Sequence, residues 1–183
     1  MINKPKIHSS LDFKIMSLGF KIRDAFNPRS RILEEVGIKN GHRVLDYGCG
    51  PGGYVMPVTK LIGDSGLLYA LDINPMAIES VQMLISKKGL ANVEVILSDC
   101  NTGLTDESID VVLLYDILHH LENRDEVLAE LHRVLKSEGV LSVTDHHLKE
   151  EDIISDITGG GLFKLTKKGK KTHSFTKEAG KTQ

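Results

Sequence analysis

The sequence contains no tryptophan, two cysteines and five prolines in 183 residues. Cys49 and Cys100 lack zinc-ligand spacing, and two cysteines cannot build the disulfide framework of a small secreted domain. No apolar run approaches the roughly 20 residues that cross a bilayer, and no basic start leads into an apolar signal core. We therefore expect a cytoplasmic protein with no membrane insertion.

An excess of charge of one sign is also missing, and the net charge of -2 gives no general attraction to nucleic acid or anionic lipid. Nucleic acid is therefore not an expected partner. The C-terminal tail is locally basic, and its lysines either contact RNA or an anionic substrate or keep a strand edge solvated, which is the simpler explanation. These residues are Lys164, Lys167, Lys168, Lys170, Lys171 and Lys177.

The composition, with 40% hydrophobic and 26% charged residues, is typical of one globular domain. From Arg43 onward, short aliphatic runs alternate with segments of helical period. This alternation indicates an α/β fold, a doubly wound and mostly parallel sheet with helices on both faces. The runs are continuously apolar, as expected of strands covered on both sides. The expected strands are Arg43–Tyr47, Leu67–Asp72, Val93–Leu97, Asp110–Tyr115 and Gly139–Asp145.

Two of the expected helices have clear boundaries. After the second strand, Asn74 caps a helix that has Pro75 at its first position and ends at Gly89. After the fourth strand, Asn123 and Glu126 form a predicted capping box. The buried stripe of this second helix is predicted to be Val127, Leu128, Leu131, Val134 and Leu135.

The two ends of the chain are expected to flank this sheet. Residues 1–40 mix basic and apolar residues, which favours one or two amphipathic helices that form either a lid or a cover for a sheet edge. Residues 41–183 form the main domain. In the tail, segments 162–166 and 172–176 alternate around Gly169, which predicts an antiparallel hairpin.

A glycine-rich turn, with Gly48, Gly50, Gly52 and Gly53, follows the first strand and brings backbone N–H groups close to a ligand. The glycines also satisfy the GxGxxG pattern of dinucleotide sites, so by themselves they leave two ligands open. Asp46 separates the two, because a carboxylate repels a pyrophosphate and attracts an ammonium or sulfonium group. The turn therefore favours a cationic amino-acid ligand.

Two further acids lie at the ends of the next strands. Asp72 ends the second strand, where a carboxylate accepts hydrogen bonds from both hydroxyls of a ribose. Asp99 follows the third strand, where it can accept a hydrogen bond from the exocyclic amine of an adenine while Leu97 or Leu104 packs on the adenine ring. One strand-end aspartate is often a turn or cap residue. Three such acids in succession indicate a nucleoside site.

The motifs VLDYGCGPGG, ALDINP, SDC, IDVVLLYDILHHL and ELHRVLKSEGVLSVTD occur in this order. Over residues 27–145 the chain resembles the class I S-adenosylmethionine-dependent methyltransferases, most closely the ubiquinone and menaquinone biosynthesis group (methyltransferase type 11). The resemblance implies a Rossmann-like sheet of seven strands with the last antiparallel. It also implies S-adenosylmethionine as cofactor and S-adenosylhomocysteine as product.

By this resemblance, Asp46 and the glycines border the methionine, Asp72 binds the ribose, and Asp99 with the Cys100 backbone holds the adenine. The implied cofactor-binding residues are Asp46, Tyr47, Gly48, Cys49, Gly50, Gly52, Asp72, Ile73, Asp99, Cys100 and Tyr115.

The methyl acceptor is expected beside the segment after the fourth strand, because ligands of open parallel sheets lie where the strand order reverses. The acceptor-side catalytic candidates there are Tyr115, Asp116, His119 and His120. Either histidine can accept a proton from a hydroxyl or amine, or else only cap the next helix or pack on the cofactor. Since the sulfonium already activates its leaving group, alignment of the acceptor is a sufficient role for the protein.

No metal site is predicted. His146 and His147 follow the fifth strand, but no cysteine or second acid cluster accompanies them. Adjacent histidines on an extended strand also point to opposite faces. Cys49 is interpreted as a small residue tolerated in the glycine turn rather than as a reactive thiol.

The sequence therefore predicts an enzyme that transfers a methyl group from S-adenosylmethionine to a small-molecule acceptor. Two alternatives stay open. One is a nicotinamide-dependent oxidoreductase on a related fold, and the other is a protein that binds S-adenosylmethionine without turnover.

Overall fold

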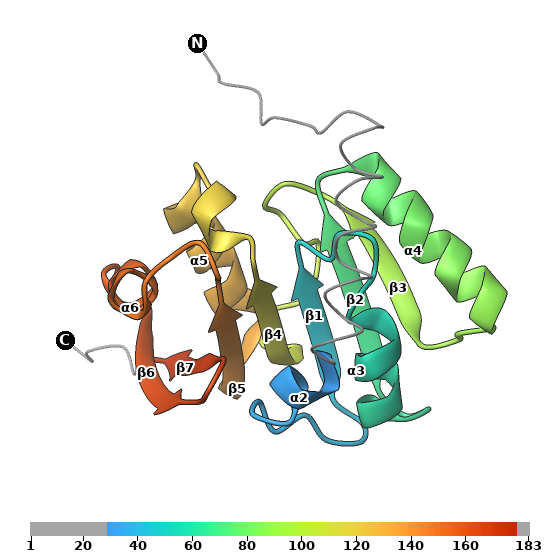
Figure 1. The fold of residues 1–183 in the computed structure, drawn as a ribbon, viewed down its shortest axis with the longest axis horizontal. Helices are drawn as coiled ribbons and strands as arrows, with labels where there is room; N and C mark the ends of the chain where they lie inside the picture. Colours follow the sequence, from blue (N-terminus) through green and yellow to red (C-terminus); the bar gives the residue numbers. More distant parts are fainter. Residues whose placement is uncertain (1–28, 179–183) are drawn as a thin grey trace, which may run out of the picture.

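The structure is a computed structural model that describes residues 29–178. These residues form a seven-stranded sheet in the order β3-β2-β1-β4-β5-β7-β6 (Figure 1). The strands are β1 (Arg43–Tyr47), β2 (Leu67–Asp72), β3 (Val93–Leu97), β4 (Ile109–Tyr115), β5 (Leu135–Thr144), β6 (Phe163–Lys168) and β7 (His173–Lys177).

The sheet is parallel from β3 through β5, because β1 pairs in parallel with β2 and β4, β2 with β3, and β4 with β5. Strand β7 lies between β5 and β6 and runs antiparallel to both. The predicted α/β fold is thus confirmed, including its seven strands and its antiparallel last strand. The sheet order reverses at β1, whose neighbours β2 and β4 follow it on opposite sides.

Helices cover both faces of the sheet, and each face has its own hydrophobic core. One core includes Leu33 of α2 (Arg29–Leu33), Val58 of α3 (Val55–Ile62) and Val81 of α4 (Pro75–Lys88). The other includes Leu131 of α5 (Arg124–Val134) and Ile157 of α6 (Glu150–Thr158). The doubly covered sheet explains why its central strands read as unbroken apolar runs.

Helix α4 begins and ends as its sequence predicts. The Asn74 side chain accepts a hydrogen bond of 3.0 Å from the Met76 backbone N–H, and Pro75 occupies the first helical position. Gly89 ends the helix in the left-handed conformation, with φ of 63°.

Helix α5 departs from its predicted ends at both sides. Asn123 has ψ of 43° rather than the extended backbone of a typical N-cap, and its side chain caps no helical N–H, so the predicted capping box is wrong. Leu135 is buried as expected, but it already belongs to β5 and pairs with Ile109 of β4. Sheet pairing therefore starts the fifth strand four residues before the predicted Gly139.

The predicted C-terminal hairpin is confirmed as β6 and β7. Strand β6 forms the sheet edge, and several of its lysines are held by nearby groups. Lys167 donates to the Glu35 backbone oxygen at 2.7 Å, and Lys168 pairs with Glu150 at 2.6 Å. These contacts fit the explanation that the basic tail keeps a strand edge from pairing.

The turn of this hairpin is fastened by the side chain of Glu35, which follows α2. Its carboxylate accepts backbone N–H bonds from Lys170, Lys171 and Thr172 at 3.0–3.2 Å, and a fourth bond from the Thr172 hydroxyl. Glu35 therefore ties the last two strands to a segment 135–137 residues earlier in the chain.

Most of the predicted N-terminal lid lies outside the described residues, since these start at Arg29. The described part is α2 and the turn after it, where Leu33 and Val36 are buried in the same core as α3. Whether residues 1–40 form a lid stays a prediction.

Within residues 29–178, no helix is both long enough and apolar enough to cross a membrane.

Replacing Glu35 with Ala should lower the free energy of unfolding by about 2 kcal/mol, because a charged acceptor of several hydrogen bonds is lost. Burial raises the pKa of Glu35, but the hydrogen bonds from Lys170, Lys171 and Thr172 together lower it by more, so the net pKa is depressed. The stability gap between wild type and variant should therefore be full at neutral pH and close as the pH falls through this lowered pKa. Urea denaturation of wild type and variant at several pH values measures this stability gap.

The matched control is Glu34→Ala, since the neighbouring Glu34 is exposed. Equal stability of the Glu35 and Glu34 variants at neutral pH would show that the carboxylate does not fasten the hairpin.

Candidate functional site

The carboxyl ends of the parallel strands meet at one edge of the sheet. In the strand registers, Tyr47 at the end of β1 lies opposite Leu71 of β2 and Leu114 of β4, and Tyr115 lies opposite Thr144 of β5. The residues that follow these strands therefore gather where the strand order reverses, the usual ligand position of such sheets.

Asp46 carries the strongest electrostatic signal at this edge. Asp46 lies in β1 and is 1% exposed. Its Oδ2 atom has no hydrogen-bond partner among the described residues. Burial raises the pKa of Asp46 to about 7, with a smaller opposing effect of Arg29 and a smaller raising effect of Asp72. A carboxyl group held this way gains most from a ligand that supplies N–H donors and positive charge.

Arg29, at the start of α2, lies close to the glycine turn and is 8% exposed. Its guanidinium carbon lies 4.4 Å from the centre of the Tyr54 ring. A Cβ atom at Gly53 would overlap this guanidinium, so only glycine lets the arginine come so close. Sequence reasoning missed Arg29, because no motif or spacing distinguishes it from the other basic residues of the N-terminal segment.

The backbone N–H groups of the glycine turn are largely used inside the protein. Gly48 and Cys49 both donate to the Leu71 carbonyl, at 2.8 and 2.9 Å, and Gly50 donates to Asp72 Oδ2 at 2.8 Å. The expectation that these N–H groups face a ligand is therefore wrong for these three residues. Donors already engaged cannot cradle a pyrophosphate, which counts further against a dinucleotide.

The glycines instead permit close packing around the turn. Gly48 has φ of 79°, and a Cβ atom there would lie 2.9 Å from Ile117, just after β4. Gly52 has φ of 85°, and a Cβ atom would lie 3.0 Å from Val81 of α4. The turn thus sits directly against the segment where the acceptor is expected.

Asp72 is held in place by two backbone groups. Its Oδ2 accepts the N–H of Gly50 and its Oδ1 accepts the N–H of Asn74, both at 2.8 Å. Ile73, another predicted cofactor residue, is half-buried beside it.

The loop after β3 carries the predicted adenine residues, with Asp99 exposed and Cys100 half-buried. The Tyr47 hydroxyl donates to the Asp99 carbonyl at 2.6 Å and so joins this loop to β1. Of the two leucines expected at the adenine ring, Leu97 is 57% exposed, whereas Leu104 packs against the core. Leu97 is thus the leucine whose exposed apolar surface can pack on an adenine ring.

The same loop is anchored to α5 by Glu130. The Glu130 carboxylate accepts the backbone N–H of Thr102 at 2.8 Å and its hydroxyl at 2.6 Å. Arg133 donates to the same carboxylate, and its hydrogen bond is the main reason that the pKa of Glu130 falls to about 2. Glu130 is therefore ionised and holds the loop at neutral pH.

On the expected acceptor side, the Tyr115 hydroxyl is buried and has a partner inside the protein. The hydroxyl lies 2.8 Å from Ser142 Oγ, and the ring packs edge-on against Tyr54 with centroids 5.0 Å apart. Burial raises the pKa of Tyr115 well above its ordinary value. This placement supports a wall residue and gives no support to proton transfer by Tyr115.

His119 is oriented by Asp145, which follows β5. Its Nδ1 lies 2.7 Å from Asp145 Oδ2, and its backbone N–H donates to the same oxygen at 3.2 Å. His119 belongs to the short 3₁₀ helix η1 (Leu118–His120). The centroids of the His119 ring and the exposed His120 ring lie 3.9 Å apart. Sequence reasoning did not include Asp145, although it too is an aspartate at a strand end.

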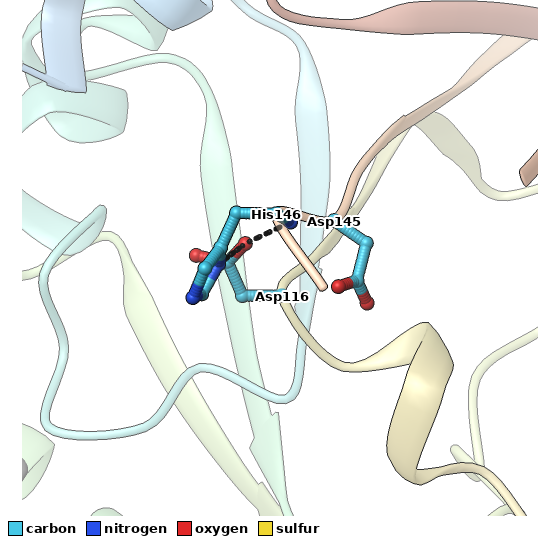
Figure 2. Close-up of side chains that lie close together, drawn as sticks. All are labelled: Asp116, Asp145 and His146. Atoms are coloured by element: carbon cyan, nitrogen blue, oxygen red, sulfur yellow. Dashed lines mark hydrogen bonds and ion pairs between the residues drawn. The ribbon is translucent and has the colours of Figure 1, made fainter. Parts of the chain in front are cut away.

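Asp116 pairs with His146 across the ends of β4 and β5. His146 Nδ1 lies 2.7 Å from Asp116 Oδ1 (Figure 2). Strand β5 ends at Thr144, so His146 and His147 lie in a turn. The centroids of their rings lie 3.9 Å apart. The expectation that an extended strand would send these histidines to opposite faces is therefore wrong.

Cys49 is 4% exposed, and burial raises the pKa of its thiol well above the ordinary value. A protonated buried thiol is a weak nucleophile, which supports the interpretation of Cys49 as a packing residue.

Comparison with known proteins agrees with this geometry. The family model described as "Methyltransferase domain" matches residues 38–180. Among curated proteins, the chain is 30% identical over 110 residues to (S)-coclaurine N-methyltransferase of Thalictrum flavum subsp. glaucum, covering 60% of this chain and 30% of that protein. It is 28% identical over 119 residues to demethylmenaquinone methyltransferase of Lactobacillus johnsonii, covering 64% of this chain and 49% of that enzyme.

The chain thus spans at most about half the length of these two curated relatives. A solved structure of similar size is an S-adenosylmethionine-dependent methyltransferase from Aquifex aeolicus, with a TM-score of 0.73 and 25% identity. That match covers 87% of this chain and 97% of the other. The chain therefore belongs to the methyltransferase domain family, among the S-adenosylmethionine-dependent methyltransferases.

Proposed function

We propose that this protein transfers the methyl group of S-adenosylmethionine to a small-molecule acceptor. The observation that carries the proposal is the buried Asp46 carboxyl group, which lacks a partner on Oδ2 at the point where the sheet order reverses. Membership of the methyltransferase domain family and the chain-wide likeness to the Aquifex aeolicus enzyme support the same reaction.

The methionine portion of the cofactor carries both charges of an amino acid, and the site offers both counter-charges. Asp46 accepts the ammonium group, and Arg29 pairs with the carboxylate across Gly53. The buried, unpartnered Oδ2 and the closeness of the Arg29 guanidinium to Gly53 support this assignment. Opposite charges in a partly dry site favour a zwitterion over a phosphate.

The nucleoside portion follows the next two strand ends. Asp72, which the backbone N–H groups of Gly50 and Asn74 hold in place, accepts hydrogen bonds from the ribose hydroxyls. Asp99 accepts a hydrogen bond from the adenine amine, and the Cys100 backbone N–H donates one to the adenine ring. The exposed side chain of Leu97 and the half-buried Ile73 offer apolar contact for the adenine.

The acceptor binds beside residues 115–121, with Tyr115 in the wall and His119 fixed by Asp145. The reaction is a direct displacement: the acceptor atom bonds to the methyl carbon while the carbon–sulfur bond breaks and its electrons stay on sulfur. Because the sulfonium is already a good leaving group, the protein contributes mainly alignment and exclusion of water.

A small acceptor fits the curated relatives, whose names refer to coclaurine and demethylmenaquinone. Residues 1–40 act as a cap over the acceptor, and the C-terminal hairpin helps to shape its pocket. Nucleic acid is not part of the proposal, because several tail lysines are engaged with Glu35, Glu150 and Glu107. The reaction takes place in the cytoplasm.

Replacing Asp46 with Asn should weaken S-adenosylhomocysteine binding by about 10- to 100-fold, because a charged partner of the ligand ammonium is lost. Isothermal titration calorimetry measures this loss, and Asp64→Asn in an exposed loop is the control that should keep wild-type affinity. NAD should not bind either protein. Tight uptake of NAD by wild type, unaffected by the Asp46 substitution, would support the oxidoreductase instead.

Turnover is tested separately from binding. Incubation with methyl-labelled S-adenosylmethionine and fractionated metabolites should yield a labelled small molecule together with S-adenosylhomocysteine. Cofactor binding without any labelled product would support the binding protein that lacks turnover.

A second variant tests the adenine loop. Glu130→Gln should lower the free energy of unfolding by about 1–3 kcal/mol and weaken S-adenosylhomocysteine binding, because the charged acceptor of the Thr102 and Arg133 bonds is lost. Thermal unfolding and calorimetry report the two effects, with exposed Glu138→Gln as control. Unchanged cofactor affinity despite the lost stability would show that the loop does not hold the nucleoside.

A further inference from the structure

A cluster of ligating side chains lies at the ends of β4 and β5 and is not used by the cofactor. It consists of Asp116, Asp145 and His146, each contributing one oxygen or nitrogen atom, and these atoms all lie within 4.8 Å of one another (Figure 2). Asp116 follows β4 and the other two residues follow β5, about thirty residues later in the chain, so the fold and not local sequence assembles them.

The spacing of these atoms is close to that around a metal ion. Bonds of about 2.1 Å put adjacent ligands of an octahedral ion about 3 Å apart and opposite ligands about 4.2 Å apart. His146 Nδ1 and Asp116 Oδ1, 2.7 Å apart, are already near the adjacent spacing. The Asp145 oxygen lies within 4.8 Å of both of these atoms, a limit slightly beyond the opposite spacing.

Two of the ligands are held before any ion arrives. The Asp145 side chain is fully buried, and its carboxylate accepts bonds from the His119 ring, the His119 N–H and the His147 N–H. Asp116 has φ of 54°, a left-handed backbone that is uncommon outside glycine and that aims its carboxylate at His146. Hydrogen-bonded partners behind the ligands are the usual support of metal sites.

We propose that Asp116, Asp145 and His146 bind one divalent metal ion. Two carboxylates and one imidazole suit an ion that accepts both oxygen and nitrogen ligands, of the Mn²⁺ or Zn²⁺ kind. The ion replaces the hydrogen bond between His146 Nδ1 and Asp116 Oδ1, and the imidazole binds it through a nitrogen lone pair. This inference revises the sequence-based expectation of no metal, which assumed that no second acid cluster existed and that His146 lay on an extended strand.

The position of the ion has a consequence for the acceptor, and this step rests on the proposed function. The ion lies next to the 115–121 segment, and three protein ligands leave coordination positions open. An acceptor that presents an oxygen atom, such as a phenol or other hydroxyl compound, can fill one of them. The site therefore favours an oxygen acceptor over an aliphatic carbon or a thioether.

Titration of Mn²⁺ into chelator-treated full-length protein tests the site. We expect uptake of one ion, seen both by calorimetry and as loss of the free Mn²⁺ signal in electron paramagnetic resonance. Asp116→Asn and His146→Ala should each weaken the uptake by at least about 10-fold. Asparagine tolerates the left-handed backbone at 116 and His146 is largely exposed, so both variants keep the fold, as thermal unfolding will verify. The control Asp64→Asn should bind Mn²⁺ as wild type does.

Binding of S-adenosylhomocysteine, measured without metal, separates this inference from the proposed function. Absence of one-to-one Mn²⁺ uptake, or uptake that is equal in Asp116→Asn, His146→Ala and wild type, overturns the metal site even when S-adenosylhomocysteine binds. One-to-one uptake that both variants lose supports the site, whether or not S-adenosylhomocysteine binds.

Discussion

The structure depends on a carboxyl group that is buried without a complete set of partners. Asp46 lies at the centre of the sheet, where desolvation raises its pKa to about 7, and Oδ2 has no hydrogen-bond partner among residues 29–178. A folded protein keeps such a group only if another interaction offsets the free energy lost when the carboxyl group is removed from water. In the proposed function, the partner of Asp46 is the ammonium group of the cofactor's methionine portion, and Arg29 pairs with the carboxylate of the same portion.

The surrounding chain positions this carboxyl group from far apart in the sequence. Parallel pairing aligns the ends of β1, β2, β4 and β5, and the close approach of Gly48 to Ile117 brings the glycine turn after β1 against the segment after β4. Glu130 fixes the loop after β3 to α5, and Glu35 fixes the hairpin to the turn after α2. Buried or half-buried carboxylates that accept backbone N–H groups are thus the recurring way in which this small domain orders its loops.

The sequence predicted what periodicity and turn chemistry encode. Five strands, the Asn74 cap and the three strand-end acids were all visible in the order of residues. Pairings between strands were not, so the start of β5 at Leu135, the Asp145 bond to His119 and the turn at His146 could not be predicted. Arg29 could not be found either, because only the fold brings its guanidinium to Gly53. The N–H groups of the glycine turn were misassigned because their partner, Leu71, belongs to another strand.

The most direct test is an NMR titration of the Asp46 carboxyl carbon, with and without saturating S-adenosylhomocysteine. In the free protein the midpoint should lie at about 7, as burial requires. In the complex it should fall by about 1–3 pH units, because the ligand ammonium stabilises the ionised form. A midpoint near that of an exposed aspartate in the free protein, or one that the ligand leaves unchanged, would contradict the central role of this carboxyl group.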